Sequence, residues 1–261
     1  MSPTFLEQIL SRKVEEVTAR RGARHDRELE AALRDRPAPR DFMGALARRG
    51  ETVRIIAEVK RASPSAGAIA TGLDAVEQAR RYATAGAAAI SVLTDGPGFG
   101  GSLDDLAAVR GAVPTPLLRK DFVVDRYQLL EARLFGADAA LLIVAALPRD
   151  TLRRLLEQCG ALTLSALVEV HDEREAEIAL AAGARIVGVN NRDLRTFAVD
   201  LATSERVLPM LPDEVKGVAE SGVRTAADAR RLRAAGAANL LVGEALVRAE
   251  DPGALIREMM G

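Results

Sequence analysis

From residue 55 onward, eight short apolar runs typical of β-strands alternate with Ala-, Leu- and Arg-rich segments that have helical spacing. The runs are Ile55 to Lys60, Ala88 to Leu93, Pro116 to Phe122, Ala139 to Val144, Ser165 to Val170, Ile186 to Asn190, Lys216 to Ser221 and Asn239 to Gly243. Eight is the number of parallel strands that closes a barrel. The alternation therefore predicts an α/β fold, a (β/α)8 TIM barrel.

The segments between the runs have the pattern of amphipathic helices, several of which end at a glycine. Examples are Asp74 to Ala85, Tyr127 to Phe135, Leu152 to Gln158, Glu173 to Ala182 and Thr225 to Ala235. We expect left-handed glycines to terminate helices at Gly86, Gly136, Gly160, Gly183 and Gly236.

A doubly wound open sheet also alternates strands with helices and is the competing fold. Its usual fingerprint, Gly-x-Gly-x-x-Gly between a strand and a helix, is absent from the sequence. The glycine-rich stretch from Gly96 to Gly101 contains Pro97 and leads into Ser-Leu-Asp-Asp, which indicates a loop before a capped helix. The closed barrel is the better prediction.

About fifty residues precede the first barrel run, and we expect one domain over 1–261 with an N-terminal helical extension (1–50) and a barrel (51–261). Phe5, Ile9, Val14 and Val17 recur near helical spacing. This helix either closes the bottom of the barrel or covers its top, and the spacing fits both. A second short helix is predicted from Asp41 to Arg48, after two prolines.

Charge and cysteine content exclude several classes of protein. The chain has 36 Lys and Arg against 37 Asp and Glu, so no global field favours nucleic acid or an anionic membrane. The single cysteine, Cys159, excludes an intrachain disulfide and a multi-cysteine zinc site, and we interpret it as a small apolar residue. The N-terminus lacks a signal pattern and no apolar stretch is long enough for a membrane span, so a cytoplasmic protein is expected.

Polar side chains gather late in the predicted strands, at the barrel end where active sites form. Glu58 and Lys60 lie two residues apart and therefore on one face of the first strand, where buried charges need a partner or a ligand. The other strand ends contribute Ser91, Arg119, Lys120, Asp121, Glu169, Asn190, Arg192, Glu220 and Ser221. Lysines, glutamates and an asparagine at one mouth suit general acid and base catalysis.

The last two strands carry a different signal, because glycines follow them. Ser221-Gly222 and Gly243-Glu244 place backbone N–H groups where an anion can approach without a β-carbon in the way. Barrels often bind phosphate in these two loops, although a glycine there also serves a tight turn. We therefore expect a phosphorylated small molecule as ligand.

The ordered set of motifs resembles indole-3-glycerol phosphate synthase over nearly the whole chain. The matching segments are Ile56-Ala-Glu-Val-Lys-Arg-Ala-Ser-Pro-Ser65, Ile90-Ser-Val-Leu-Thr-Asp95, Gly101-Ser-Leu, Leu118-Arg-Lys-Asp-Phe122, Val168-Glu-Val-His171, Asn190-Asn-Arg-Asp-Leu194, Glu220-Ser-Gly222 and Leu241-Val-Gly-Glu-Ala-Leu246. The family's substrate is 1-(2-carboxyphenylamino)-1-deoxyribulose 5-phosphate, which undergoes ring closure, decarboxylation and dehydration without a cofactor or metal.

The resemblance also implies roles for residues. Lys120 corresponds to the general acid at the ribulose carbonyl, and Glu169 to an acid or base of the dehydration. Glu58 and Asn190 correspond to orienting groups, and Lys60 to a cation between the substrate anions that also moves a proton. The division of proton transfers among these groups stays open. The implied binding residues are Arg192, Ser221, Gly222, Gly243 and Glu244 at the phosphate, Ser63 and Glu220 at the anthranilate carboxylate, and Phe122 at the ring. Phe99 corresponds to an aromatic residue of a mobile loop, and Ser221 also belongs to the implied catalytic set.

Three positions depart from the family pattern. Ala66 stands where the first loop commonly has lysine, Ala219 precedes Glu220 where serine is common, and the second loop is glycine-rich around Pro97. These departures concern loop closure, and none removes a proposed catalytic residue. The resemblance gives His171 no role, and we interpret it as a solvated loop residue.

Two other functions are compatible with parts of the sequence. A Schiff-base aldolase would use Lys60 or Lys120 as a nucleophile. A non-catalytic phosphate-binding partner subunit would need disabled catalytic positions, whereas here they are intact. The expected assembly is a monomer, with possible weak association with other tryptophan-pathway enzymes.

Overall fold

Eight of the strands in the described part of the chain close into a parallel barrel, as the sequence predicts. The computed structural model describes residues 4–47, 50, 52–63 and 67–261. The predicted helix end at Arg48 and the loop residues Pro64, Ser65 and Ala66 lie outside these ranges. The barrel order is β1-β10-β9-β8-β7-β6-β5-β4.

The barrel strands agree with the predicted runs to within a few residues at their ends. They are β1 (Arg54–Val59), β4 (Ala89–Leu93), β5 (Leu117–Lys120), β6 (Ala139–Ile143), β7 (Ser165–Val170), β8 (Ile186–Asn190), β9 (Lys216–Glu220) and β10 (Asn239–Val242). The short strands β2 (Ala62–Ser63) and β3 (Gly67–Ala68) form an antiparallel pair outside the barrel.

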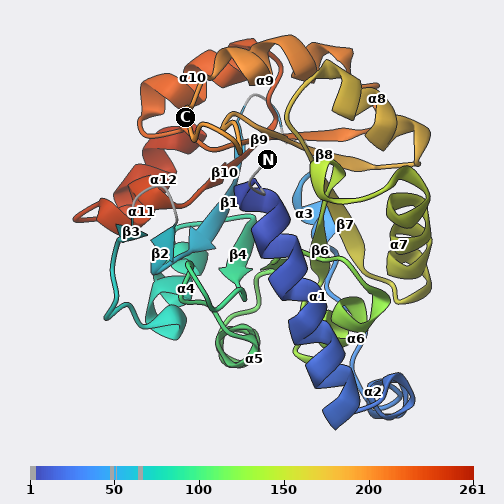
Figure 1. The fold of residues 1–261 in the computed structure, drawn as a ribbon. Helices are drawn as coiled ribbons and strands as arrows, with labels where there is room; N and C mark the ends of the chain where they lie inside the picture. Colours follow the sequence, from blue (N-terminus) through green and yellow to red (C-terminus); the bar gives the residue numbers. More distant parts are fainter. Residues whose placement is uncertain (1–3, 48–49, 51, 64–66) are drawn as a thin grey trace.

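Helices surround the barrel (Figure 1). Those between or after barrel strands are α4 (Ala75–Thr84), α5 (Leu103–Ala112), α6 (Arg126–Leu134), α7 (Arg149–Ala161), α8 (Glu173–Ala181), α9 (Ala202–Val207), α10 (Ala226–Ala234), α11 (Glu244–Arg248) and α12 (Pro252–Met260). Short 3-10 turns occupy Val144–Ala146 and Leu208–Met210. Asp74, Ser102, Asp125, Asp172 and Thr225 cap the helices that follow them.

Four of the five predicted helix-ending glycines have the expected left-handed backbone. Gly86, Gly136, Gly183 and Gly236 have φ between 91° and 99°. The prediction for Gly160 is wrong, because α7 continues through it to Ala161. Thr163 takes the left-handed conformation instead, with φ of 56°.

Each barrel strand alternates between two apolar layers. Side chains facing outward, such as Ile55, Ala57 and Val168, pack in the main core beneath the helices. Inward-facing Ile56, Leu118 and Leu167 belong to a separate cluster inside the barrel. Further along the same strands the inward positions become polar, so the upper end of the barrel carries charge above an apolar floor.

The N-terminal extension covers both ends of the barrel. Helix α1 (Phe5–Ala23) lies across the barrel, with its N-terminal end over the centre in Figure 1, and is followed by α2 (Asp26–Leu33). Phe42 of α3 (Phe42–Ala45) and Leu46 are fully buried in the cluster inside the barrel. Of the two alternatives for the first helix, α1 therefore takes the cover of the top, while the separate short helix α3 plugs the bottom.

A buried ionic network attaches α1 to the barrel top. The Lys13 ammonium lies 2.6 Å from Asp95 and 3.0 Å from Asp121, with 1% of the Lys13 side chain exposed. Asp121 also binds the fully buried guanidinium of Arg119 at 2.9 Å. Burial opposes the charge of Asp121, but Arg119 and Lys13 outweigh it and hold the pKa of that carboxyl below its usual range. Arg119 and Asp121, two strand-end groups noted in the sequence, thus anchor α1.

Candidate active site

A cavity of about 630 Å³ opens at the C-terminal ends of the barrel strands. All fourteen residues predicted for catalysis or binding line it: Glu58, Lys60, Ser63, Phe99, Lys120, Phe122, Glu169, Asn190, Arg192, Glu220, Ser221, Gly222, Gly243 and Glu244. The strand ends therefore bring together one candidate site from segments spread over most of the sequence.

Lys120, at the end of β5, lies between two carboxylates. Its ammonium nitrogen is 2.8 Å from Glu169 Oε2 on β7 and 2.7 Å from Glu220 Oε2 on β9. Burial disfavours the cation, but the charges of Glu169 and Glu220 outweigh this and raise the pKa of Lys120 above its ordinary value. Lys120 is therefore held as an ammonium ion that can donate a proton.

Glu220 has the less satisfied of the two carboxylates. Its Oε1 is buried and makes no hydrogen bond within the described part of the chain. Burial raises the pKa of Glu220 above its ordinary value, and the nearby charges of Glu169 and Glu58 add to the effect against that of Lys120. Gly188 on β8 leaves the space that this Oε1 occupies.

Glu169 accepts bonds from more partners and is the better stabilised anion. Asn190 Nδ2 donates to its Oε1 at 3.0 Å, while Lys120 binds Oε2. Burial alone would raise the pKa of Glu169, but Lys120 and His171 outweigh it and place the pKa below its usual range. The carboxylate is therefore held in its ionised form.

Glu58 and Lys60 form an ion pair at the end of β1, on the shared face that the sequence predicts. Lys60 Nζ lies 2.8 Å from Glu58 Oε1, and Ser91 on β4 donates to Glu58 Oε2 at 3.4 Å. Burial opposes the charge of Glu58, but Lys60 and Lys120 lower the pKa below its ordinary value. A β-carbon on Gly243 would lie 2.6 Å from Glu58 Oε1, so that glycine leaves room for the pair.

The loops after β8, β9 and β10 form another part of the cavity wall. Ser221 and Gly222 have φ of 63° and 83°, so two successive left-handed residues turn the chain at the end of β9. A β-carbon on Gly222 would lie 2.5 Å from Val199 Cγ1, which explains why glycine is needed there. Arg192 donates to the Phe197 carbonyl at 3.1 Å, and Glu244 pairs with Arg248 at 3.0 Å.

Aromatic and apolar side chains line the cavity beside the charged groups. The rings of Phe99 and Phe122 have centroids 6.0 Å apart. Phe5, Leu6 and Ile9 of α1 also line the cavity. The apolar repeat of α1 is visible in the sequence, but it does not predict that these residues line the cavity, because periodicity identifies a buried face and not the surface that it packs against.

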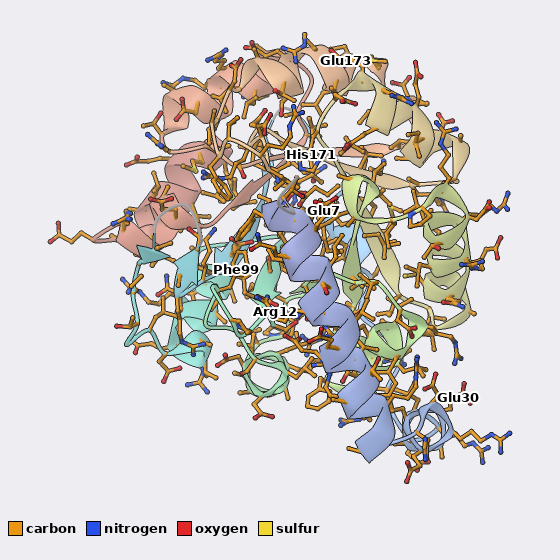
Figure 2. The ribbon with its side chains drawn as sticks, in the orientation of Figure 1. Glu7, Arg12, Glu30, Phe99, His171 and Glu173 are labelled. Atoms are coloured by element: carbon orange, nitrogen blue, oxygen red, sulfur yellow. The ribbon has the colours of Figure 1, made fainter. Side chains whose placement is uncertain are left out.

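The interpretation of His171 as a solvated loop residue is wrong. Its side chain is 14% exposed and lies 3.4 Å from Glu169 and 3.0 Å from Glu175. Figure 2 draws it beyond the N-terminal end of α1 in projection, with Phe99 beside the helix and Glu173 at the outer rim. The alternation of side chains along β7 thus continues one residue past its end at Val170, so that His171 lies on the same side as Glu169.

The fold and these side chains define a (β/α)8-barrel enzyme with paired lysines and carboxylates in a cavity at the C-terminal ends of its strands. The family model for indole-3-glycerol phosphate synthase matches residues 6–259. The chain belongs to the indole-3-glycerol phosphate synthase family.

Curated relatives with that name agree with the assignment. A Nocardioides sp. protein is 55% identical over 234 residues, covering 90% of this chain and 89% of the relative. A Mycolicibacterium vanbaalenii protein is 50% identical over 259 residues, covering 99% and 94%. A Mycobacterium tuberculosis protein is 49% identical over 261 residues, covering 100% and 95%.

Solved structures of other enzymes share the fold alone. A 3-hexulose-6-phosphate synthase aligns with a TM-score of 0.60 at 20% identity, covering 80% of this chain and 98% of that one. A thiamine phosphate pyrophosphorylase from Pyrococcus furiosus gives a TM-score of 0.59 at 19% identity, covering 80% of this chain and 94% of that one.

Among the described helices, none is long and apolar enough to cross a membrane. Within the described part of the chain, no group of three or more His, Cys, Asp or Glu side chains is placed to hold a metal ion.

Proposed function

We propose that this chain converts 1-(2-carboxyphenylamino)-1-deoxyribulose 5-phosphate into indole-3-glycerol phosphate, CO2 and water through the strand-end residues of the cavity. The observation that carries this is the ammonium ion of Lys120, fixed between Glu169 and Glu220 at 2.8 and 2.7 Å in a cavity bordered by the Ser221-Gly222 turn. Each step of the reaction is a proton transfer or a bond rearrangement that such side chains can assist.

Ring closure is assigned to Lys120 as general acid. It protonates the ribulose carbonyl oxygen while the carboxyl-bearing ring carbon forms a bond to the carbonyl carbon. The ring carbon then loses its carboxylate as CO2, and the electrons of that bond restore the aromatic ring. The raised pKa of Lys120 keeps the proton in place until charge develops on the oxygen.

Dehydration is assigned to Glu169 together with a lysine. Glu169 removes the proton from the carbon beside the nitrogen, and Lys60 or Lys120 supplies a proton to the departing hydroxyl, which leaves as water. Asn190 and Lys120 fix the two oxygens of Glu169 at 3.0 and 2.8 Å, so its orientation is set before substrate enters. Glu58 holds Lys60 at 2.8 Å for the same purpose.

Substrate binding is divided between the charged and the aromatic walls. Arg192, Ser221, Gly222, Gly243 and Glu244 are assigned to the phosphate region, where the turn after β9 supports backbone N–H donation. Phe99 and Phe122 are assigned to the aromatic ring, with Ser63 and Glu220 near its carboxylate. Burial raises the pKa of Glu220 and so favours its protonated form. A protonated Glu220 can lie beside the carboxylate of the substrate without repelling it.

The aldolase alternative conflicts with the state of Lys120. A Schiff base needs a neutral amine, whereas Glu169 and Glu220 stabilise the ammonium form and raise the pKa of Lys120. Borohydride treatment with a carbonyl substrate should therefore leave the protein unmodified by mass spectrometry. A trapped adduct on Lys60 or Lys120 would favour the aldolase.

The direct test is the conversion of the carboxyphenylamino ribulose phosphate into a fluorescent indole product by the purified protein. Lys120→Met should lower kcat by about 100-fold or more, while KM changes little, because the acid acts in the transition state. Lys216→Met is the matched control. Lys216 begins β9, at the opposite end of the strand from Glu220, and its loss should leave turnover at the wild-type level. The assignment fails if the wild-type protein forms no product at any pH or if the Lys120 variant retains full turnover.

We also propose that one cytoplasmic domain, acting as a monomer, is the working unit, with at most weak association with other enzymes of tryptophan biosynthesis. The support is that one chain contributes all fourteen assigned residues to the cavity. Light scattering on the purified protein should give the mass of one chain, 27.8 kDa. A stable dimer would contradict the proposal.

A further inference from the structure

His171 connects the assigned base Glu169 to a second carboxylate on the neighbouring helix. The Nδ1 atom of His171 lies 3.0 Å from Glu175 Oε2, and the His171 backbone N–H donates to that same oxygen at 2.8 Å. Asp172 caps α8 by accepting from the Glu175 backbone N–H at 2.8 Å. Glu175 of α8 therefore holds one edge of the ring through Nδ1 and the residue's backbone through its N–H.

The other edge of the ring faces the active site. His171 Nε2 is buried, makes no hydrogen bond within the described residues, and lies 3.4 Å from Glu169 Oε1. That oxygen also accepts from Asn190, while Lys120 holds the second oxygen of Glu169. A small movement of the carboxylate would complete a charge-assisted bond to the imidazole.

We propose that His171 is a positioning residue, which, anchored by Glu175, fixes the carboxylate of Glu169 and keeps it ionised for the dehydration step. The inference rests on the proposed role of Glu169. It assigns His171 no contact with substrate, because its effect passes through Glu169. The arrangement explains why this side chain is enclosed although the strand ends before it.

The surrounding charges support an imidazolium at this position. Burial opposes it, but the nearby carboxylates of Glu169 on β7 and Glu175 on α8 raise the pKa of His171 to about 10. Glu169 in turn faces Lys120 from β5 and Glu220 from β9, with Glu58 of β1 acting on the same lysine. Since Glu220 repels the charge of Glu169, a second cation beside Glu169 has a clear electrostatic effect.

The sign of the expected pH effect follows from the charge of His171. A neighbouring cation favours the ionised form of Glu169, so removing it raises the pKa of that carboxyl. The acid limb of kcat, where Glu169 loses its charge, then moves to higher pH. At pH values above about 10 the imidazole is neutral in the wild type as well, and the two proteins should converge.

The test compares His171→Asn, His171→Gln and Glu175→Gln with the wild type over the full pH range. His171→Asn should lower kcat about tenfold with KM nearly unchanged, and should move the acid limb to higher pH. His171→Gln can still donate a hydrogen bond to Glu169 but carries no charge. It should therefore recover part of kcat, while the acid limb of its kcat–pH profile stays at the higher pH. Glu175→Gln, which loosens the ring, should produce a smaller change in the same direction.

Controls separate this inference from folding and from the role of Glu169. His25→Gln, at the exposed start of α2, and Glu177→Gln, on the exposed face of α8, should match the wild type. If His171→Asn does not fold, as judged by circular dichroism, the other two variants carry the test. Wild-type kcat and an unmoved acid limb in the folded His171 and Glu175 variants would overturn the inference. Glu169→Gln distinguishes the two proposals, since full activity in that variant removes the role of Glu169 itself.

Discussion

The carboxylate of Glu220 fills the space that a side chain on Gly188 would need. Gly188 lies in β8 directly opposite Glu169 in the strand pairing, and Glu220 Oε1 occupies the position of its absent β-carbon. From there Glu220 Oε2 binds Lys120 at 2.7 Å. A glycine on the inner face of the barrel thus helps to determine where the assigned general acid is held.

Gly188→Ala should therefore impair catalysis without touching a charged group. The added methyl overlaps Glu220 Oε1 and must turn the carboxylate away from Lys120, so we expect kcat to fall about 100-fold. Steady-state kinetics on the folded variant measures this.

Gly217→Ala is the matched control for that substitution. Gly217 lies on β9, and its β-carbon would meet Leu208 and Leu211, outside the cavity. This variant should lose stability but keep the wild-type kcat per folded molecule. Equal kcat in both alanine variants would contradict the role assigned to Gly188.

The barrel could be predicted from the sequence because each strand repeats the same local pattern. The predicted run Ser165 to Val170 coincides with β7, and the inward positions of strands such as β1 followed from period two. The features that the sequence did not predict depend on tertiary contacts. An amphipathic repeat showed that α1 buries a face, but not that the face lies against the cavity.

The predictions for single residues were wrong or incomplete for similarly specific reasons. Gly160 is predicted to end a helix, but α7 continues to Ala161 and β7 begins only at Ser165. The sequence does not single out Gly188, because a glycine in a strand indicates no partner by itself. Gly188 lies two residues before Asn190, so the sequence could have placed both on the inner face of the barrel. The position of the Glu220 carboxylate against Gly188 could come only from the folded barrel.

Lys13→Met should loosen the attachment of α1 to the barrel. The substitution leaves Asp95 and Asp121, whose side chains are each 1% exposed, without their shared ammonium ion. Breaking a buried ion pair in this way costs about 3–5 kcal/mol. KM should also rise, since α1 carries apolar residues of the cavity wall. Urea denaturation and steady-state kinetics check the two effects.

Val14→Ala provides the comparison on the same helix. Val14 is 54% exposed on the outer face of α1, so its loss should change neither stability nor KM appreciably. If Lys13→Met were as stable as this control, the ionic network would contribute nothing to the attachment of α1.

Glu220→Gln should reverse a stability cost that the wild-type site carries at neutral and alkaline pH. The pKa of Glu220 is raised on folding, because burial and the charges of Glu169 and Glu58 outweigh the attraction of Lys120. The folded state then binds more protons than the unfolded state, so this group lowers stability as pH rises. The cost is absent below the ordinary value of 4.5 and complete above the raised folded-state pKa.

The amide of glutamine has no charge to bury, so the variant should gain stability relative to the wild type as pH increases. We expect the difference in unfolding free energy between variant and wild type to be larger at about pH 8 than at about pH 5. Turnover should fall, because the amide no longer balances the charge of Lys120 beside the reacting groups. Denaturation at both pH values, with exposed Glu157→Gln on α7 as control, measures the effect. A difference that stays constant with pH would mean that Glu220 ionises at its ordinary value, and that the Glu169 charge and burial do not govern it.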